Sequence, residues 1–222
     1  DDHFDAASDQ TVSVTTTDDD TASFTVTQSG GSTSVAETGS TDTFTVVLDA
    51  QPTSNVVISV TSGDTGEATV SPSTLTFTSG NWNSAQTVTV TGVDDSLVDG
   101  SQTTAATISV VDASSDDDFD GVADQTVSVT TTDSDVAGFT VIESGGTTTV
   151  AEDGSTTDDF TVVLDAQPIS DVVISVTSSD TGEATVTSLI TFTSSNWDTP
   201  QVVTVTGVDA VSYTHLTLPT KA

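Results

Sequence analysis

The stretch DDDFDGVADQTVSVTTTDSD, residues 116–135, decides the architecture of this chain because it occurs twice. Residues 1–20 read DDHFDAASDQTVSVTTTDDD, and Phe4 matches Phe119 at a spacing of 115 residues. An internal repeat constrains the architecture more strongly than any single residue does. The chain of 222 residues therefore contains about two copies of one folding unit, each long enough to bury its own core.

Other motifs recur with nearly the same period. FTVVLDAQP stands at 44–52 and 160–168, TGEATV at 65–70 and 181–186, and VTVTGVD at 88–94 and 203–209. The repeat predicts a chain in four parts. These are the last strand and loop of a truncated preceding repeat (1–20), a complete repeat (21–135), a second repeat that lacks its C-terminal strands (136–210), and a foreign tail (211–222).

The tail, VSYTHLTLPTKA, differs in composition from everything before it. It contains the only Tyr, the only basic residue (Lys221) and one of the two His. It resembles the translation of a sequencing-adapter read-through, so we expect residues 211–222 to be non-native. The alternative is a natural C-terminal tail.

Short runs that alternate apolar and polar residues predict strands, and the turn-forming clusters between them predict loops. Seven or eight such runs per unit, with no convincing helix, are typical of an antiparallel sandwich. We therefore expect an all-β chain of tandem antiparallel Ig-like β-sandwiches. The predicted strands are 11–17, 43–48, 56–61, 67–70, 74–78, 86–93, 105–111 and 126–132, with their repeats in the second unit.

The formal charge of −33 comes from 34 acidic residues against one basic residue. Such a charge repels nucleic acid and anionic membranes, because binding to either requires Lys and Arg. There is no Cys, so disulfides and thiolate sites are excluded. Self-repulsion on this scale calls for bound divalent cations or for a salty medium that screens the charge, and the two are compatible.

One group of acids has the spacing D-x-D-x-D-G of a calcium loop. Alternate carboxylates in this pattern converge on one ion, and the glycine allows the sharp turn between them. The N-terminal copy is degraded, with His3 and Ala6 in place of an acid and the glycine. The predicted ligands of this loop are Asp116, Asp118, Asp120 and Asp124.

A second group of acids lies in the stretches VTVTGVDDSLVDG (88–100) and VSVTTTDSD (127–135). Together with the Phe-Thr-Val opening at 24–26 and TLTF at 74–77, these stretches resemble Calx-beta domains, the calcium-binding sandwiches of sodium–calcium exchangers. The resemblance covers both units loosely. It implies calcium ligands at Asp64, Asp94, Asp95, Asp99, Asp133 and Asp135.

Calcium at these acids is also physically sensible without the resemblance. The loops of a sandwich gather at its two ends, where acids from separate loops can meet around one ion that takes six to eight oxygens. The second unit keeps Asp180 and Asp209 but loses the partners, so its site is expected to be incomplete. The alternative is that the acids are solvated loops that maintain solubility and discourage edge pairing.

Other residues are assigned structural roles. Trp82 and Trp197 occupy one repeat position, so we expect packing instead of sugar stacking. Glu37 and Glu152 precede a strand, and we expect them at a solvated strand edge; the alternative is that they are ligands. The carboxylates are repeated on loops and lack a neighbouring nucleophile, Lys or Arg, so we expect no enzyme.

The sequence thus favours a calcium-binding structural repeat that forms a rigid stalk in an extracellular or cell-surface protein, such as a bacterial adhesin. Its partners would be calcium ions and neighbouring repeats, with a glycan or surface protein at the end of the stalk. The alternative is a carbohydrate- or protein-binding module, including an accessory domain of a secreted hydrolase.

Overall fold

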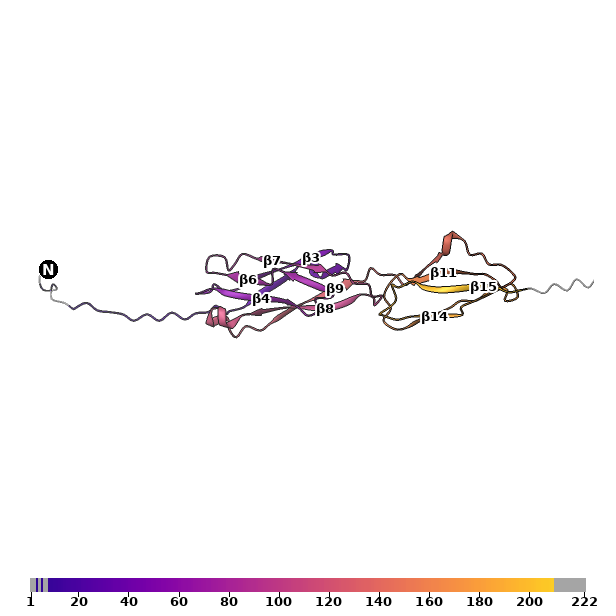
Figure 1. The fold of residues 1–222 in the computed structure, drawn as a ribbon. Coiled ribbons are helices and arrows are strands. Elements are labelled where there is room, and N and C mark those ends of the chain that lie inside the picture. Colours follow the sequence, from indigo (N-terminus) through magenta and orange to yellow (C-terminus); the bar gives the residue numbers. More distant parts are fainter. Residues whose placement is uncertain (1–2, 4, 6–7, 210–222) are drawn as a thin grey trace, which may run out of the picture.

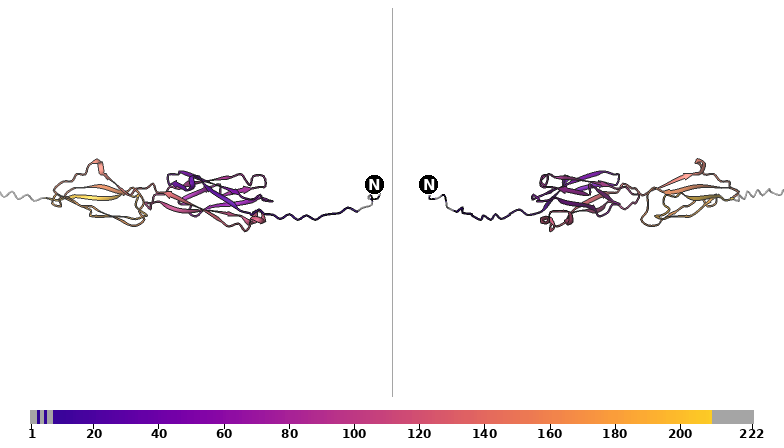
Figure 2. Two further views of the ribbon diagram at one scale, coloured as in Figure 1. Left: turned by 180° about the vertical axis from the view of Figure 1, so that it is seen from behind. Right: turned by 60° about the vertical axis from the view of Figure 1, so that its left-hand side comes forward.

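A computed structural model describes residues 3, 5 and 8–209 of the chain. Two β-sandwiches lie end to end, and an arm without strands precedes them (Figure 1). The two further views show the same succession of arm, first sandwich and second sandwich (Figure 2). The prediction of an all-β chain of antiparallel Ig-like sandwiches is confirmed. Among the described residues, no helix is long and apolar enough to cross a membrane.

The first sandwich consists of a four-stranded and a five-stranded sheet. The four-stranded sheet has the order β1 (Phe24–Gln28), β3 (Thr41–Leu48), β7 (Gln86–Gly92) and β5 (Ala68–Ser71). The five-stranded sheet has the order β2 (Thr33–Ala36), β9 (Gln125–Thr132), β8 (Gln102–Val110), β4 (Val56–Ser62) and β6 (Thr74–Phe77). All neighbours are antiparallel except β2 and β9, which run parallel.

Buried and exposed side chains alternate along the strands, and the buried ones form the core of the first sandwich. In β3, Phe44 and Val46 are fully buried, whereas Thr45 between them is partly exposed. Trp82 packs against this core, as Trp197 does against the core of the second sandwich. The packing role expected for both tryptophans is therefore confirmed. Of the strands of the first sandwich, β1 and β2 were not among the predicted runs, and β2, with the four residues TSVA, is too short for a clear pattern.

The second sandwich repeats the first sheet in the order β10 (Phe139–Glu143), β11 (Thr157–Leu164), β15 (Gln201–Gly207) and β13 (Ala184–Val186). Its other sheet has only β12 (Val172–Ser175) and β14 (Leu189–Phe192). No described residue forms a counterpart of β8 or β9. Apolar side chains consequently remain open to solvent, such as Phe139 at 55% and Val173 at 58% exposure. The short 3-10 turns of the two sandwiches are Ser29–Gly31, Asp112–Ser114, Asp117–Phe119 and Ser144–Gly146.

The strand predicted at residues 11–17 does not form, and the segment 8–23 has no regular structure. Val12 and Val14 are 85% and 80% exposed. The identical sequence at 126–132 lies within β9, where it pairs along β8. No counterpart of β8 comes before residue 11 in these 222 residues, and a strand needs a neighbour to satisfy its backbone groups. The tail at 211–222 lies outside the described residues.

The two sandwiches meet at a short backbone contact. Leu97 forms an isolated parallel bridge with Gln167. The Gln167 amide donates to the carbonyl oxygen of Ser96 at 2.6 Å, and the Val98 amide donates to the carbonyl oxygen of Gln167 at 3.4 Å. The contact therefore comes from the loop that follows β7, which is also the loop that carries Asp94, Asp95 and Asp99.

Candidate metal centre

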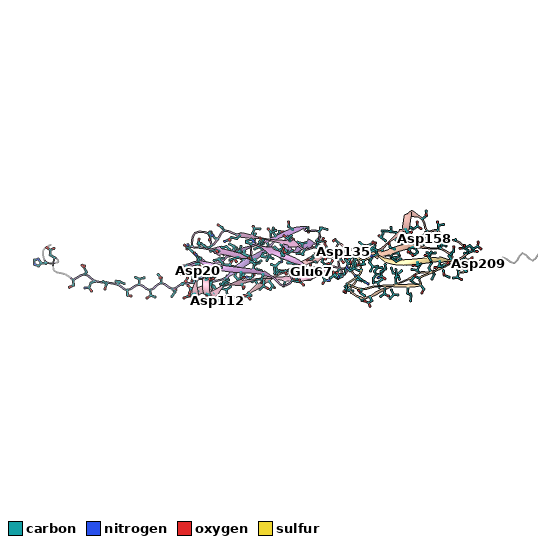
Figure 3. The ribbon with its side chains drawn as sticks, viewed as in Figure 1. Asp20, Glu67, Asp112, Asp135, Asp158 and Asp209 are labelled. Carbon is teal, nitrogen blue, oxygen red and sulfur yellow. The ribbon has the colours of Figure 1, made fainter. Side chains whose placement is uncertain are left out.

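Three carboxylates meet at the end of the first sandwich that faces the second. Glu37, Asp133 and Asp135 each offer one oxygen, and these oxygens lie within 4.8 Å of one another. Glu37 follows β2 and the two aspartates follow β9. Because β2 and β9 run parallel, with Ala36 opposite Thr132, the residues after both strands emerge at the same end of the sheet. Figure 3 shows Asp135 at this junction.

A glycine lets the loop after β7 join this group. At Gly92 a Cβ atom would lie 2.1 Å from the carbonyl oxygen of Ala36, so only glycine allows β7 to pass this close to the end of β2. The next amide, that of Val93, donates to the carbonyl oxygen of Glu67 at 2.9 Å. Asp94 and Asp95 follow directly, so the acids of three loops share one pole.

The charges of this pole disturb one another. Burial raises the pKa of Glu37, and the charges of Asp133, Asp95 and Asp135 raise it further, against the Ser134 amide that donates to Glu37 Oε2. Burial likewise raises the pKa of Asp135, with added repulsion from Asp133, Asp94 and Asp95. Ionising all of these carboxylates at once is therefore unfavourable.

A second set of acids adjoins the first. Burial raises the pKa of Glu67, and the charges of Asp99, Asp95, Glu37 and Asp64 add to the rise. Asp133 differs, because hydrogen bonds from the Asp135 and Gly100 amides lower its pKa. The electrostatic coupling of Glu67 to both Asp99 and Glu37 makes the two sets one continuous acidic cluster.

Several oxygens of the cluster are buried without any hydrogen-bond donor among the described residues: Glu67 Oε2, Asp99 Oδ1 and Asp135 Oδ2. Buried acceptors are normally satisfied, and each exception calls for an explanation such as an ion. The sequence has one Lys and no Arg, and that Lys221 lies outside the described residues. The described residues therefore offer no positive charge to balance this cluster.

The structure brings together five acids that the sequence singled out, with Asp64 exposed at the rim beside Glu67. These five are Asp94, Asp95, Asp99, Asp133 and Asp135. The expectation that Glu37 lies at a solvated edge is wrong, because its side chain is 1% exposed. Glu67 was missed altogether. Both glutamates recur in the second unit, as Glu152 and Glu183, and this repetition was the signal that could have identified them.

The D-x-D-x-D-G loop lies at the opposite pole, near Asp112 and Asp20 in Figure 3, and does not join the cluster. Asp116 is buried there as a cap. Its Oδ2 accepts from the amides of Thr53 and Ser54 at 2.7 and 2.6 Å, and these bonds lower its pKa to about 2. The next residues form a 3-10 turn, Asp117–Phe119, that buries Phe119.

Calcium binding by the loop at residues 116–124 therefore stays a prediction, and the geometry of the loop does not add support to it. The structure leaves the other acids of this loop exposed, and among the described residues this loop holds no group of three carboxylate oxygens within 4.8 Å of one another. The same spacing of acids can serve a turn, because a carboxylate can accept hydrogen bonds from nearby backbone amides, as Asp116 does. The exposed members are Asp118, Asp120 and Asp124.

No protein-family model and no curated protein matches this chain. Among solved structures, the apo form of the Calx CBD1 domain is 14% identical with a TM-score of 0.38, over 52% of this chain and 100% of that one. CBD12 from CALX1.2 is 12% identical with a TM-score of 0.36, over 84% of this chain and 76% of that one. SSP-19, an MSP-domain protein-like family member of Caenorhabditis elegans, is 14% identical with a TM-score of 0.33, over 48% of this chain and 97% of that one.

Proposed function

We propose that this chain is a calcium-binding structural repeat. The observation that supports the proposal is the acidic cluster at the sandwich junction, where carboxylate oxygens are buried and the described part of the chain supplies neither a donor nor a basic residue for them. Burying carboxylates costs free energy unless they are paired or coordinate a metal.

The chemistry of the donors suits calcium. Calcium takes six to eight oxygen ligands in flexible geometry, whereas magnesium demands a tight octahedron and keeps its waters. The cluster supplies only carboxylate oxygens and comes from loops that can adjust. Glu37, Asp133 and Asp135 would hold the ion, with Asp94, Asp95, Asp99 and Glu67 completing the oxygen set.

Binding would stiffen the junction between the sandwiches. The loop 94–99 carries acids of the cluster and also the residues that contact Gln167. An ion that fixes this loop thereby fixes the contact, because ligands from separate loops come together only in the ordered state. We infer a rigid stalk of repeated sandwiches in an extracellular or cell-surface protein, of the adhesin kind, where modules with calcium affinities of about 10⁻⁴–10⁻³ M operate.

The alternative of a carbohydrate-binding module has less support. Stacking on sugars needs exposed aromatic faces, whereas Trp82 and Trp197 both pack against the cores of their sandwiches.

Calorimetric titration of calcium into the EDTA-treated, dialysed full chain tests the proposal. We expect saturable binding that magnesium does not reproduce, and at least a tenfold loss of affinity, about 1.4 kcal/mol, in Asp135→Asn. The matched control is Asp20→Asn, which changes the repeat counterpart of Asp135 in the exposed arm and should leave binding unchanged. Equal binding by Asp135→Asn and the parent would contradict the assigned ligands, and no saturable binding would contradict the function.

A further inference from the structure

The pairing of β2 with β9 joins the first and the last part of the first sandwich. The two strands run parallel over four residue pairs, from Thr33 opposite Val129 to Ala36 opposite Thr132. The arm precedes this sandwich at one end, and the second sandwich follows at the other (Figure 1). Tension along the chain therefore enters the sandwich through β1 and β2 and leaves it through β9, so the load crosses between β2 and β9.

The direction of these two strands decides how their pairing bears the load. Tension pulls β2 back towards the pole where the arm enters, and it pulls β9 forwards to the pole where the second sandwich follows. The two strands are therefore pulled along their length in opposite directions, which loads the ladder in shear. In shear the evenly spaced bonds of a parallel ladder share the load, whereas bonds that are peeled from one end break one after another. The pair β2 and β9 thus forms a mechanical clamp between the two ends of the sandwich.

Buried side chains shield this clamp from water. Thr33 and Val35 of β2 are buried, and so are Val129 and Thr131 of β9. Hydrogen bonds in such surroundings are stronger than in water, because the local dielectric is low. The ladder of the clamp is therefore placed where its bonds resist tension well.

Further hydrogen bonds extend the clamp at the end where β9 is pulled. The Glu37 amide donates to the carbonyl oxygen of Thr132 at 3.1 Å. The Thr132 hydroxyl donates to the carbonyl oxygen of Val35 at 3.3 Å, and the Ser134 amide donates to Glu37 Oε2 at 3.0 Å. In a pair of strands under shear, tension is greatest where the pulled chain leaves the ladder. These bonds therefore lie where separation of the two strands would begin.

The three carboxylates of the candidate metal centre lie across this same end. Glu37 follows β2, whereas Asp133 and Asp135 follow β9, and their oxygens lie within 4.8 Å of one another. Burial and the charges of Asp133, Asp95 and Asp135 raise the pKa of Glu37, so the ionised carboxylates repel one another across the clamp when no cation is present. Asp135 Oδ2 is buried without a donor among the described residues, so this oxygen can serve as a ligand.

We propose that the first sandwich is a force-bearing unit whose clamp is locked by a cation held by Glu37, Asp133 and Asp135. The ion ties the end of β9 to the end of β2 where tension would start to separate them, and its removal replaces this tie by repulsion. The lock acts inside the sandwich, in addition to the stiffening of the junction. The part of the ion rests on the proposed calcium site, whereas the clamp rests only on the pairing of β2 with β9.

Single-molecule force spectroscopy of the full chain tests the clamp and its lock. The sequence has no Cys, so Val12→Cys with Val136→Cys attaches handles at two exposed positions that enclose the first sandwich alone. Unfolding of residues 24–132 should release a length on the order of 300 Å. With calcium at about ten times its dissociation constant, the lifetime under constant load should be about tenfold longer than in EDTA, because the ion binds the closed clamp and not the separated one. Magnesium and NaCl should not reproduce this gain.

A second pair of handles separates a lock on the clamp from a general stabilisation of the fold. Ser79→Cys with Ala113→Cys attaches both handles at exposed positions of the pole opposite to the cluster, because β6 and β8 both end beside the start of β4. This load peels the sandwich open at that pole and does not shear β2 against β9. At equal load we expect shorter lifetimes than in the first geometry, and little change with calcium.

Variants in the first geometry test the residues. Glu37→Gln takes one ligand from the clamp and should remove most of the gain produced by calcium. Glu152→Gln is the matched control, because it changes the repeat counterpart of Glu37 outside the loaded segment, and it should keep the full gain. Thr132→Val removes the hydroxyl that bonds the Val35 carbonyl and should shorten the lifetime in EDTA severalfold. Thr130→Val, on the same strand, should not.

The outcomes distinguish this inference from the proposed function. Equal effects of calcium in the two geometries would overturn the lock, because the ion would then stabilise the fold as a whole. Calcium that binds in the calorimetric titration but leaves the lifetime in the first geometry unchanged would overturn the lock and leave the proposed function standing. Absence of calcium binding would overturn the lock and the proposed function together. Equal lifetimes of the two geometries in EDTA would overturn the clamp itself, whatever calcium does.

Discussion

Glu37 and Glu152 occupy the same place in the two repeats and have opposite surroundings. Glu37 is buried among acids of the β7 and β9 loops, whereas Glu152 is exposed because no described residue corresponds to those after β9. A buried carboxylate among like charges is unfavourable when ionised. At the scale of the single residue, Glu37 therefore lowers stability in the absence of a cation and contributes to it when a cation is bound.

Glu37→Gln should separate these two effects. The amide keeps an oxygen for the Ser134 amide but removes the charge, so we expect a melting temperature a few degrees higher in EDTA and a smaller rise on adding calcium. Thermal unfolding with and without calcium provides the measurement. Glu152→Gln is the control and should change neither value, and a lower melting temperature of Glu37→Gln in EDTA would contradict this role of the charge.

Asp116→Asn tests the cap at the other pole. The amide cannot accept the same set of donors from Thr53, Ser54 and Asp118, so the melting temperature should fall by several degrees. The increase produced by calcium should remain unchanged, because this residue lies away from the cluster. Asp118→Asn, at an exposed neighbour, is the comparison. Loss of the calcium response in Asp116→Asn would restore residues 116–124 as a metal loop.

At the scale of the element, the parallel pairing of β2 with β9 and the close passage of β7 over β2 create the site. Gly92→Ala would place a methyl group against the Ala36 carbonyl. It should lower the free energy of unfolding by roughly 2 kcal/mol or more. Chemical denaturation measures the loss. Gly80→Ala, whose nearest contact would be Thr78 Oγ1 at 3.7 Å, should be close to neutral. Equal stability of the two variants would contradict the close passage.

The alternation of apolar and polar residues predicted most strands of both sandwiches, because that pattern is a local property of the chain. The acids that follow β7 and β9 were implied as ligands by the resemblance to Calx-beta domains, and the gathering of loops at one end of a sandwich made that grouping physically sensible. The burial of Glu37 was not predictable in this way. It depends on the pairing of β2 with β9, whose residues stand more than 90 positions apart, and on a strand of four residues. For the loop at 116–124 the sequence alone does not separate capping from calcium binding, because the two use similar acid patterns.

At the scale of the molecule, the calcium-free chain should respond to pH in two opposite ways. Glu37, Glu67 and Asp135 have raised pKa values, so the folded state binds their protons more tightly than the unfolded state. Their contribution to stability is present at low pH and is lost as the pH rises through the folded pKa values. The pKa of Asp116 is lowered, so its contribution is present above its ordinary pKa and is lost as the pH falls towards about 2.

We therefore expect the free energy of unfolding in EDTA to pass through a maximum in weak acid and to decline towards neutral pH. Calcium should remove the decline at neutral pH, because the ion replaces the protons. Urea unfolding at a series of pH values measures both curves. A free energy of unfolding in EDTA that rises steadily from weak acid to neutral pH would contradict the raised pKa values of the carboxylates in the cluster.

The two tryptophans allow calcium binding by the first sandwich to be tested within one molecule. Trp82 lies in the first sandwich, which has the cluster, and Trp197 in the second, where Glu152 and Glu183 are exposed. In Trp197→Phe and Trp82→Phe the remaining tryptophan reports the unfolding of one sandwich. The decisive measurement is the thermal unfolding of both variants in EDTA, calcium, magnesium and NaCl. We expect calcium alone to raise the Trp82 transition markedly, with a smaller effect on the Trp197 transition. Equal stabilisation of the Trp82 transition by NaCl would show that the acids are only screened surface, and would contradict the calcium site.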